Sequence, residues 1–350
     1  MEWESPLALV QEGLGRLLYL LPASARRVQI EVTNRCNLHC GMCPRDLYGL
    51  EHEDMDLTLF RQILEALPAP VRRVTLVGWG ESLLHRDLFT MIRLVQEGGR
   101  EVQLTSNALL LRGDHMEQLL AHPPDYLAFS IDSLDEDAGD GHPLTVPARE
   151  RIARVMARRG PGQAPYVSFQ TTLHPGGAQT VCSIVRLAGR LGVERVALMR
   201  LDTRYVPGLE RPDLEEERRI IAAAEAVGRE VGVMVEHTLG FGRGPARHLY
   251  RLLRPWMYRM DRYCPKTFDY LYVTCTGEVT PCCALPRHVV GRVEEGLETI
   301  WQGPALRSFL RHQASICGSC DLLSVRHRYG PGLHLDPVQG GRGRPTPCES

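Results

Sequence analysis

The stretch "VQIEVTNRCNLHCGMCPR" (residues 28–45) joins a short apolar segment to three cysteines, Cys36, Cys40 and Cys43. Its first six residues alternate between apolar and polar side chains, which predicts a β-strand. Glycine and proline within the cysteine segment disfavour a continuous helix, so we expect a loop that wraps around a bound group. Thiolates are soft ligands for zinc and for iron–sulfur clusters. Because a four-iron cluster has four corners, three cysteines would leave one iron open to a small molecule.

A structural zinc site is the alternative interpretation of this loop. His39 or a distant residue would then supply the fourth ligand. Zinc sites generally show paired cysteines two to four residues apart, with a second pair elsewhere in the chain. The spacing of these three cysteines matches that pattern less well.

Short apolar segments alternate with longer amphipathic segments from residue 28 to about residue 237. The predicted strands are residues 28–33, 73–78, 101–106, 126–132, 166–172, 195–200 and 232–237. Predicted helices between them include residues 56–67, 86–98 and 178–192. This rhythm predicts parallel strands in an α/β barrel or a doubly wound sheet, where ligands bind at the carboxyl ends of the strands. Polar residues follow the first four strands, which favours a barrel mouth that grips one ligand.

The composition is that of a globular protein, with 43% hydrophobic and 24% charged residues in a chain of 350. The formal net charge of −1 gives no electrostatic reason to expect binding to nucleic acid or to an anionic membrane. The N-terminal apolar run is too short to span a bilayer and lacks a basic start, so we expect an amphipathic helix there. Clustered cysteines in a chain of this length favour reduced, metal-binding thiols and therefore a cytoplasmic location.

The segment "EVTNRCNLHCGMC" (residues 31–43) resembles the signature of the radical S-adenosylmethionine (radical SAM) enzymes. The resemblance implies an α/β fold with a partial (β/α)6 TIM-like barrel, in which Cys36, Cys40 and Cys43 bind a [4Fe-4S] cluster. The fourth iron would chelate the methionine part of SAM, and reductive cleavage would yield a 5′-deoxyadenosyl radical. Met42 occupies the position of a residue that packs near the adenine.

The segment "GWGES" (residues 78–82) resembles the glycine-rich segment that contacts the methionine amino group in this family. Gly78 and Gly80 would let the backbone approach a ligand, and Glu81 would accept a hydrogen bond from an ammonium group. Trp79 and Ser82 depart from the family pattern. Further strand-end residues expected near SAM or at the same mouth are Ser106, Asn107, Ser130, Asp132, Gln170, Thr172, Arg200 and Asp202. Such residues would otherwise cap helices or contact water.

A second group of cysteines comprises Cys264, Cys275, Cys282, Cys283, Cys317 and Cys320. The segment "LYVTCTGEVTPC" (residues 271–282) predicts a hairpin with Thr276–Gly277 at its turn, followed by a helix at residues 296–310. The hairpin would bring the first of these cysteines near the last two. Four thiolates saturate either a zinc ion or a cluster, and spacing alone does not separate these possibilities.

Next to a radical SAM signature, this second group resembles the C-terminal SPASM or twitch extension. The family pattern is a cysteine, then G-x4-C, then C-x2-C, and no cysteine occurs between Cys320 and Cys348. The resemblance therefore implies the twitch form, with one auxiliary [4Fe-4S] cluster. The implied ligands are Cys264, Cys282, Cys317 and Cys320, with Cys275 or Cys283 as alternatives to Cys282. Cys182 is expected in the core, and Cys348 as a free thiol.

Four segments are predicted along the chain. They are an N-terminal helix (residues 1–27), a radical SAM core (28–240), a small cysteine-rich α+β SPASM/twitch domain (241–328) and a flexible tail (329–350).

The leading functional prediction is a dehydrogenase-type modification of a small molecule, in which the auxiliary cluster takes an electron from the substrate radical. A maturase that modifies a peptide or protein side chain is the enzymatic alternative, weakened because only about 27 residues precede the first strand. A zinc-stabilised binding protein without catalysis is the third. The resemblance also implies a flavodoxin- or ferredoxin-type electron donor. Residues considered as the general base are Lys266, Arg200, Asp202, His174 and His237. Lys266, the only lysine, would otherwise be solvated beside the second cysteine group.

Overall fold

The computed structural model describes residues 24–49, 51–134, 146–160, 162–204, 206–237, 264, 266–267, 269–317 and 320. These residues fall into two compact units. The barrel unit contains described residues 29–64 and 73–237, and the cysteine-rich unit contains described residues 24–28, 65–72 and 264–320. Most of the predicted N-terminal helix, the tail and Cys348 lie outside the described residues. The predicted helix is wrong at its end, because residues 24–26 are not helical and Arg27 begins a strand.

Seven strands build the barrel unit in the order of the sequence, with β1 next to β2 and β7 at the end. They are β1 (Arg27–Ile30), β2 (Arg73–Leu76), β3 (Glu101–Ser106), β4 (Tyr126–Ser130), β5 (Tyr166–Leu173), β6 (Arg195–Arg200) and β7 (Met234–His237). Every pair from β2 to β7 is parallel. Among the described residues β7 pairs with β6 alone, so the sheet is an open, partial barrel as predicted.

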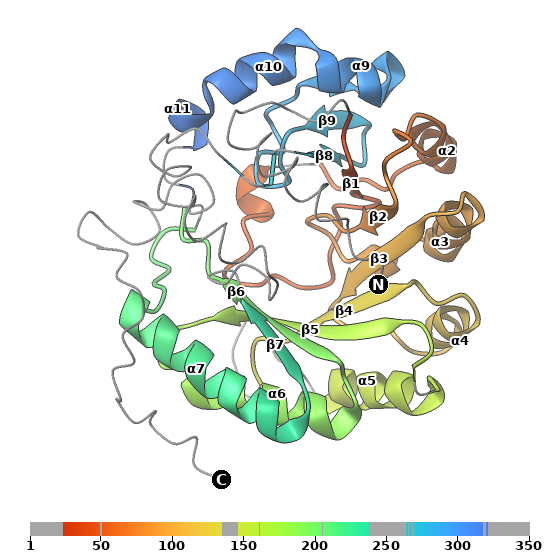
Figure 1. Cartoon of the computed structure of the whole chain (residues 1–350). Helices are drawn as coiled ribbons and strands as arrows, with labels where there is room; N and C mark the ends of the chain where they lie inside the picture. Colours follow the sequence, from red (N-terminus) through yellow and green to blue (C-terminus); the bar gives the residue numbers. More distant parts are fainter. Residues whose placement is uncertain are drawn as a thin grey trace, which may run out of the picture. The chain divides into compact units, whose positions relative to one another are not determined.

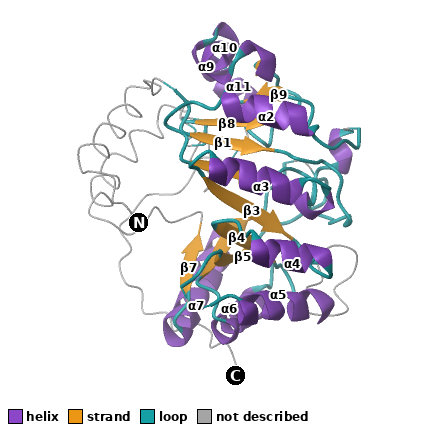
Figure 2. Cartoon of the chain, turned by 90° about the vertical axis from the view of Figure 1, so that its right-hand side faces the viewer, coloured by secondary structure: helices purple, strands orange, loops and turns teal. Residues whose placement is uncertain are grey.

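Helices follow the strands and cover one face of this sheet (Figures 1 and 2). They are α2 (Leu57–Glu65), α3 (Leu88–Glu97), α4 (Asp114–Ala121), α5 (Val146–Arg158), α6 (Ala178–Leu191) and α7 (Leu214–Val231), with short turns η1 (Asp46–Tyr48) and η2 (Ser82–Leu84). Their apolar sides pack against alternate strand residues such as Val102, Leu104 and Phe129, all fully buried. Cys182 on α6 is also fully buried, which confirms its predicted place in the core.

Charged and aromatic side chains line the start of the strands, on the face opposite the helices. Arg73 pairs with Glu101 at 2.8 Å and lies over the ring of Tyr126, whose centroid is 3.6 Å from its guanidinium carbon. Arg195 lies 5.8 Å from the ring centroid of Tyr166. This ladder fills the amino-terminal end of the inner face with paired groups. The other end, where the strands finish, is therefore the end available to a ligand.

The cysteine-rich unit contains an antiparallel sheet and a run of short helices. Strands β8 (Tyr270–Val273), β9 (Glu278–Thr280) and β10 (Gly291–Arg292) pair in that order, and the predicted hairpin is confirmed between β8 and β9. Gly277 adopts a φ of 82° at its turn, a conformation that favours glycine. The predicted helix at 296–310 is interrupted at Gly303, so α9 (Leu297–Gln302) and α10 (Pro304–Arg311) are separate, followed by α11 (Gln313–Cys317); η4 (Val293–Glu295) precedes them.

Candidate functional site

The cysteine loop (residues 33–49) follows β1 and is anchored at its base by the segment that precedes α2. The Asn34 side chain donates to the Glu51 carbonyl at 2.6 Å and accepts from the Glu53 amide at 2.8 Å. Arg35 forms a two-pronged ion pair with Asp54, with 2.9 Å between Nε and Oδ1. Asn34 and Arg35 directly precede the first cysteine. These contacts therefore fix the point at which the thiols leave the strand.

The three thiols of the loop are half-buried, as is Met42 between two of them. Burial raises the pKa of all three thiols, and burial together with the charges of Cys43 and Cys36 raises that of Cys40 to about 12. This mutual influence indicates that the sulfurs face a shared space, since Coulomb effects fall with distance. A thiol loses its proton on binding metal, so assembly of a metal group here would release protons.

The thiols of the cysteine loop do not converge on one point in the described structure. Among the described residues, no three His, Cys, Asp or Glu side chains converge closely enough to hold one ion. The irons of a cubane occupy separate corners, so its cysteine ligands stand farther apart than the ligands of one zinc ion. The donor set, three thiols on one short loop, is chemically that of an iron–sulfur site.

A buried cation stands beside the thiols. The Arg45 side chain is only 5% exposed, and its Nη2 pairs with Asp46 at 3.0 Å and donates to the Leu38 carbonyl at 3.3 Å. Its Nη1 is buried and has no hydrogen-bond partner among the described residues. Burial raises the pKa of Cys36 and Cys43, and the charge of Arg45 acts in the opposite direction. An anionic cluster, whose sulfurs accept hydrogen bonds, fits this cation.

The glycine segment after β2 packs against β1 and the cysteine loop. A Cβ on Gly78 would lie 2.3 Å from Cγ of Glu31. A Cβ on Gly80 would lie 2.4 Å and 2.5 Å from the carbonyl oxygens of Thr33 and Arg35. Gly78 therefore makes room for the Glu31 side chain, and Gly80 makes room for the backbone at the start of the loop. The close approach of SAM to these glycines stays a prediction.

Glu81 ties the ends of two strands together. Its fully buried carboxylate accepts from the Asn107 amide at 2.8 Å and from the Leu83 amide at 3.2 Å, and Ser106 also donates to it. Burial raises its pKa, and its charge in turn raises the pKa of the first thiol in the cysteine loop. The Asn107 side chain donates to Asn37 of that loop at 3.0 Å. Three donors of the protein thus bind the Glu81 carboxylate, and its contact with the ammonium group of SAM stays a prediction.

Four predicted residues meet at the carboxyl ends of β4 and β5. Ser130 pairs with Gln170 in the sheet register, and Asp132 accepts from the Thr172 amide. Alternation along the two strands puts these side chains on the face opposite the helices. The charge of Asp132 also contributes to the raised pKa of Cys40, after burial and the other two thiols. The mouth predicted from the sequence therefore brings these strand ends close to the cysteine loop.

Arg200 and Asp202 are placed differently from the other strand-end residues. Arg200 shares its face with the buried residues of β6, and its Nε donates to Glu217 of α7 at 2.6 Å. Its side chain is 9% exposed and that of Glu217 fully buried, so this pair lies on the helix side of the sheet. Asp202 pairs with Arg204 in the following loop. The exposed position at this end of β6 is Met199, which sequence reasoning missed although strict alternation would have found it.

The second cysteine group gathers within the cysteine-rich unit. The charge of Cys320 contributes to the raised pKa of Cys264, after burial, and Cys264 acts in the same way on Cys282. The Cys320 amide lies 2.6 Å from the Cys317 carbonyl. The four predicted ligands are therefore brought toward one another from three separate segments. Their role as ligands stays a prediction.

The two alternative ligands differ from each other in their surroundings. Cys275 is buried in the loop between β8 and β9. Cys283 receives hydrogen bonds from Cys282, from Lys266 at 3.0 Å and from the Tyr270 hydroxyl, and these lower its pKa against the effect of burial. Cys283 thus shares the space of the second group, whereas Cys275 belongs to the hairpin.

Two of the residues considered as a general base are unsuited to that role. Burial alone would lower the pKa of Lys266, but the thiols of Cys283 and Cys282 raise it overall, so it stays protonated. His237 shares its face with the buried Val235 and lies 3.6 Å from Glu225 on α7, on the helix side of the sheet. His174 is half-buried after β5.

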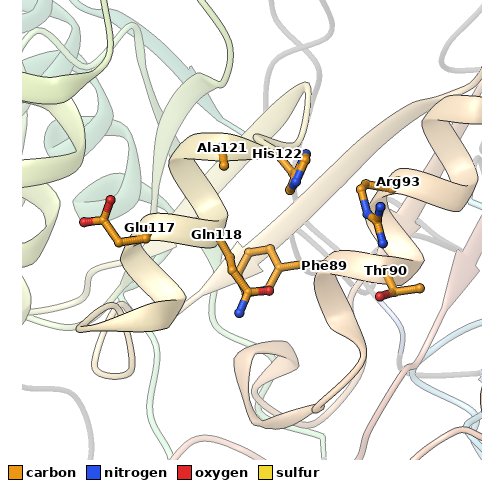
Figure 3. A pocket seen from close by; sticks show the side chains of 7 residues that line it. All are labelled: Phe89, Thr90, Arg93, Glu117, Gln118, Ala121 and His122. Carbon is orange, nitrogen blue, oxygen red and sulfur yellow. The ribbon is translucent and has the colours of Figure 1, made fainter.

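A surface cavity of about 410 Å³ lies between α3 and α4 (Figure 3). It is lined by Phe89, Thr90, Arg93, Glu117, Gln118, Ala121 and His122. Every lining residue belongs to or directly follows one of these helices, and none is a predicted site residue. The cavity is therefore separate from the strand-end site.

Both cysteine groups lie in segments that match the models of known protein families. The family description "Radical SAM superfamily" matches residues 30–177, and "Iron-sulfur cluster-binding domain" (SPASM) matches residues 264–321. The first range contains the cysteine loop, Glu81 and Asp132. The second contains all four predicted auxiliary ligands.

Several proteins of known function are similar to the chain. A tungsten-containing aldehyde ferredoxin oxidoreductase cofactor-modifying protein of Pyrococcus furiosus is 27% identical over 180 residues, 49% of this chain and 50% of that protein. The match thus spans half the length of that relative. An AdoMet-dependent heme synthase of Methanosarcina barkeri is 21% identical over 322 residues, 86% of this chain and 89% of the relative. A probable GTP 3',8-cyclase of Methanopyrus kandleri is 33% identical over 127 residues, 36% and 38% of the two chains.

Solved structures share the fold at low sequence identity. Streptococcus suis SuiB bound to precursor peptide SuiA superposes with a TM-score of 0.67 at 17% identity, covering 92% of this chain and 76% of that one. The protein anSMEcpe with bound AdoMet gives a TM-score of 0.59 at 12% identity, covering 85% and 87%. Within the described residues, no helix has the length and apolar composition needed to cross a bilayer.

Proposed function

Because the chain belongs to the radical SAM superfamily and carries a SPASM iron–sulfur domain, we propose that it oxidises a carbon of its substrate by a radical route. Cys36, Cys40 and Cys43 would hold the cluster that binds SAM. A second, auxiliary [4Fe-4S] cluster would be held by four cysteines of the cysteine-rich unit. These are Cys264, Cys282, Cys317 and Cys320.

The proposed reaction removes two electrons from the substrate. When bound, the first cluster and SAM supply a 5′-deoxyadenosyl radical, which takes one hydrogen atom from a substrate C–H bond and leaves as 5′-deoxyadenosine. The substrate radical would then lose a proton to solvent and its unpaired electron to a cluster held by the four predicted auxiliary ligands, and an alcohol carbon would become a carbonyl. An external acceptor would reoxidise that cluster, and a flavodoxin- or ferredoxin-type donor would supply the electron consumed by SAM cleavage.

The chain's own residues would hold and orient these groups. Glu81 and Asn107 fix the ends of β2 and β3 against the cysteine loop, and Arg45 offers a buried cation beside the thiols. Asp132 lies near Cys40 at the mouth, where it would contact SAM or substrate. The contacts of these side chains support the proposed roles.

One observation carries the proposal, namely the different number of thiols in the two groups. The cysteine loop offers three, which leaves one iron of a cluster open to SAM. The cysteine-rich unit brings together four predicted ligands, which would close a cluster completely. A closed cluster exchanges electrons and does not bind a substrate, so it suits the removal of an electron from the substrate radical.

Modification of a peptide or protein side chain is the second candidate. It is supported by SuiB bound to a precursor peptide and by anSMEcpe bound to a peptide, which share the fold of this chain. Oxidation of a peptide side chain would follow the same two-electron balance. Oxidation assays with small alcohols and with peptides encoded by neighbouring genes would distinguish a small-molecule substrate from a peptide substrate.

Anaerobic reconstitution followed by iron counting tests the proposal. About eight irons per chain are expected from two cubanes. Cys36→Ala should abolish 5′-deoxyadenosine formation from SAM with a reductant. Cys317→Ala should keep that cleavage while stopping substrate oxidation, and Cys275→Ala is the matched control that should keep both clusters. Colourless protein with bound zinc, or substrate turnover by Cys317→Ala, would refute the proposal.

A further inference from the structure

The only lysine of the sequence, Lys266, directs its ammonium group into the second cysteine group. Its Nζ lies 3.0 Å from Sγ of Cys283 and 5.0 Å from the ring centroid of Tyr270. Lys266 is half-buried, and its ammonium lies against a cysteine sulfur and an aromatic ring. The expectation of a solvated lysine beside these cysteines is therefore wrong.

Within the described part of the chain, the charge of this ammonium is balanced by sulfur and not by a carboxylate. Among the described residues, the nearby carboxylate of Asp269 is paired with Arg27, at 2.8 Å between Oδ1 and Nε. The groups that act on Lys266 are the thiols of Cys283, Cys282 and Cys264. A cation withdrawn from water needs an anionic partner, because its desolvation is otherwise uncompensated. The site therefore provides one positive charge for a group built on these sulfurs.

A cluster held by four thiolates carries negative charge, and it gains one more unit on reduction. A nearby cation stabilises the reduced form more than the oxidised form, since the attraction grows with the charge. Hydrogen bonds to the sulfurs and local charge are among the factors that set iron–sulfur potentials. Both the N–H donors and the charge of Lys266 would stabilise the reduced cluster and therefore raise its reduction potential.

We propose that Lys266 is the charge partner of the auxiliary cluster and makes that cluster a stronger electron acceptor. This inference rests on the auxiliary cluster of the proposed function. It assigns Lys266 as a positioning and electrostatic residue, which acts on the cluster and touches no substrate. Its ammonium contacts Cys283, which directly follows the predicted ligand Cys282.

Redox titration of the auxiliary cluster alone tests the inference. A full-length background variant with Cys36, Cys40 and Cys43 changed to alanine removes the first cluster, so that the spectroscopic signal reports only the second. In this background Lys266→Met should lower the equilibrium constant for electron uptake by the cluster at least tenfold. This corresponds to a fall of about 59 mV in the reduction potential of a one-electron couple. Lys266→Arg keeps the charge and should stay within threefold of the parent. Arg307→Met removes an exposed charge on α10 in the same unit and should change nothing.

Each result has a distinct meaning. An unchanged potential in Lys266→Met, with the cluster present, overturns the role of Lys266 and leaves the proposed function standing. A background variant that binds no iron overturns the auxiliary cluster itself and both proposals with it. If Lys266→Met folds by circular dichroism but retains no iron, while Lys266→Arg retains it, a cation is needed for assembly and the inference is supported. Loss of iron from both Lys266→Met and Lys266→Arg overturns the inference, because the shape of the lysine side chain and not its charge would then be needed for cluster assembly.

Discussion

Replacing Gly80 by alanine should displace the cysteine loop from its anchor. The added Cβ would stand 2.4 Å from the Thr33 carbonyl oxygen and 2.5 Å from that of Arg35, whereas Cβ atoms in proteins essentially never approach closer than 3.0 Å. Both obstacles are backbone atoms, so no side chain can rotate away. The loop and the glycine segment must separate by more than half an ångström.

This separation has an energetic and a functional cost. Overpacking of this kind costs about 1–3 kcal/mol. The hydrogen bond from the Glu81 amide to the Arg35 carbonyl, 2.8 Å long, spans the same contact and should weaken with it. Arg35 directly precedes Cys36, so the strain reaches the first thiol. We expect lower stability together with weaker binding of the first cluster.

Urea unfolding of the metal-free chain and iron counting after reconstitution would measure these effects. Gly41→Ala is the matched control: Gly41 lies within the cysteine loop, and nothing stands within 4 Å of its added Cβ. The Gly80 variant should lose iron from the first site, while the Gly41 variant keeps it. Equal stability and equal iron content in the two variants would show that the glycine segment does not anchor the loop.

Three further predictions concern the surroundings of the loop. Glu81→Gln should cost about 1–3 kcal/mol in urea unfolding, because its amide group would face a backbone donor; the exposed Glu97→Gln is the control, and equal stabilities would contradict the prediction. Burial raises the pKa of Asp54, but hydrogen bonds from Arg35 and Thr33 lower it overall, so its stabilisation is complete above about pH 4 and is lost as the pH falls through the lowered pKa. Asp54→Asn should flatten this acid-side loss in unfolding measurements from pH 3 to 7, and an unchanged profile would count against it. Arg45→Met should speed iron loss to a chelator from the first site, whereas Met at the 85% exposed Arg86 should not, and equal rates would exclude a role for the buried cation.

Local sequence patterns predicted most of the fold. The alternation of apolar residues located every strand of the barrel unit, and β3 and β6 match their predicted bounds. Strand ends were less accurate, since β1 ends at Ile30 and not at residue 33. The residues after Ile30 instead bond to the segment before α2, for example through the Met55 amide and the Val32 carbonyl at 2.8 Å. Such a contact between distant segments leaves no periodic signal.

The direction of each side chain was predicted less well than its position at a strand end. Ser106 and Arg200 both end strands, yet both share a face with buried residues that pack against helices. Thr105 and Met199, their immediate neighbours, face the other way. The glycines of the "GWGES" segment were predicted to approach a ligand, and the structure packs them against Glu31 and the cysteine loop.

The sequence by itself determined the three-thiol donor set of the cysteine loop, because three thiols at a fixed spacing on one loop are a local property that needs no tertiary contact. It also determined the order of strands and helices, since each follows from periodicity within a short window. Only the tertiary structure decided which charges meet the sulfurs. Arg45 stays beside its own loop, whereas Lys266 meets the thiols of Cys282 and Cys283 sixteen and seventeen positions away, across a hairpin. Such partners are selected by the burial of charge, which depends on how separate segments pack.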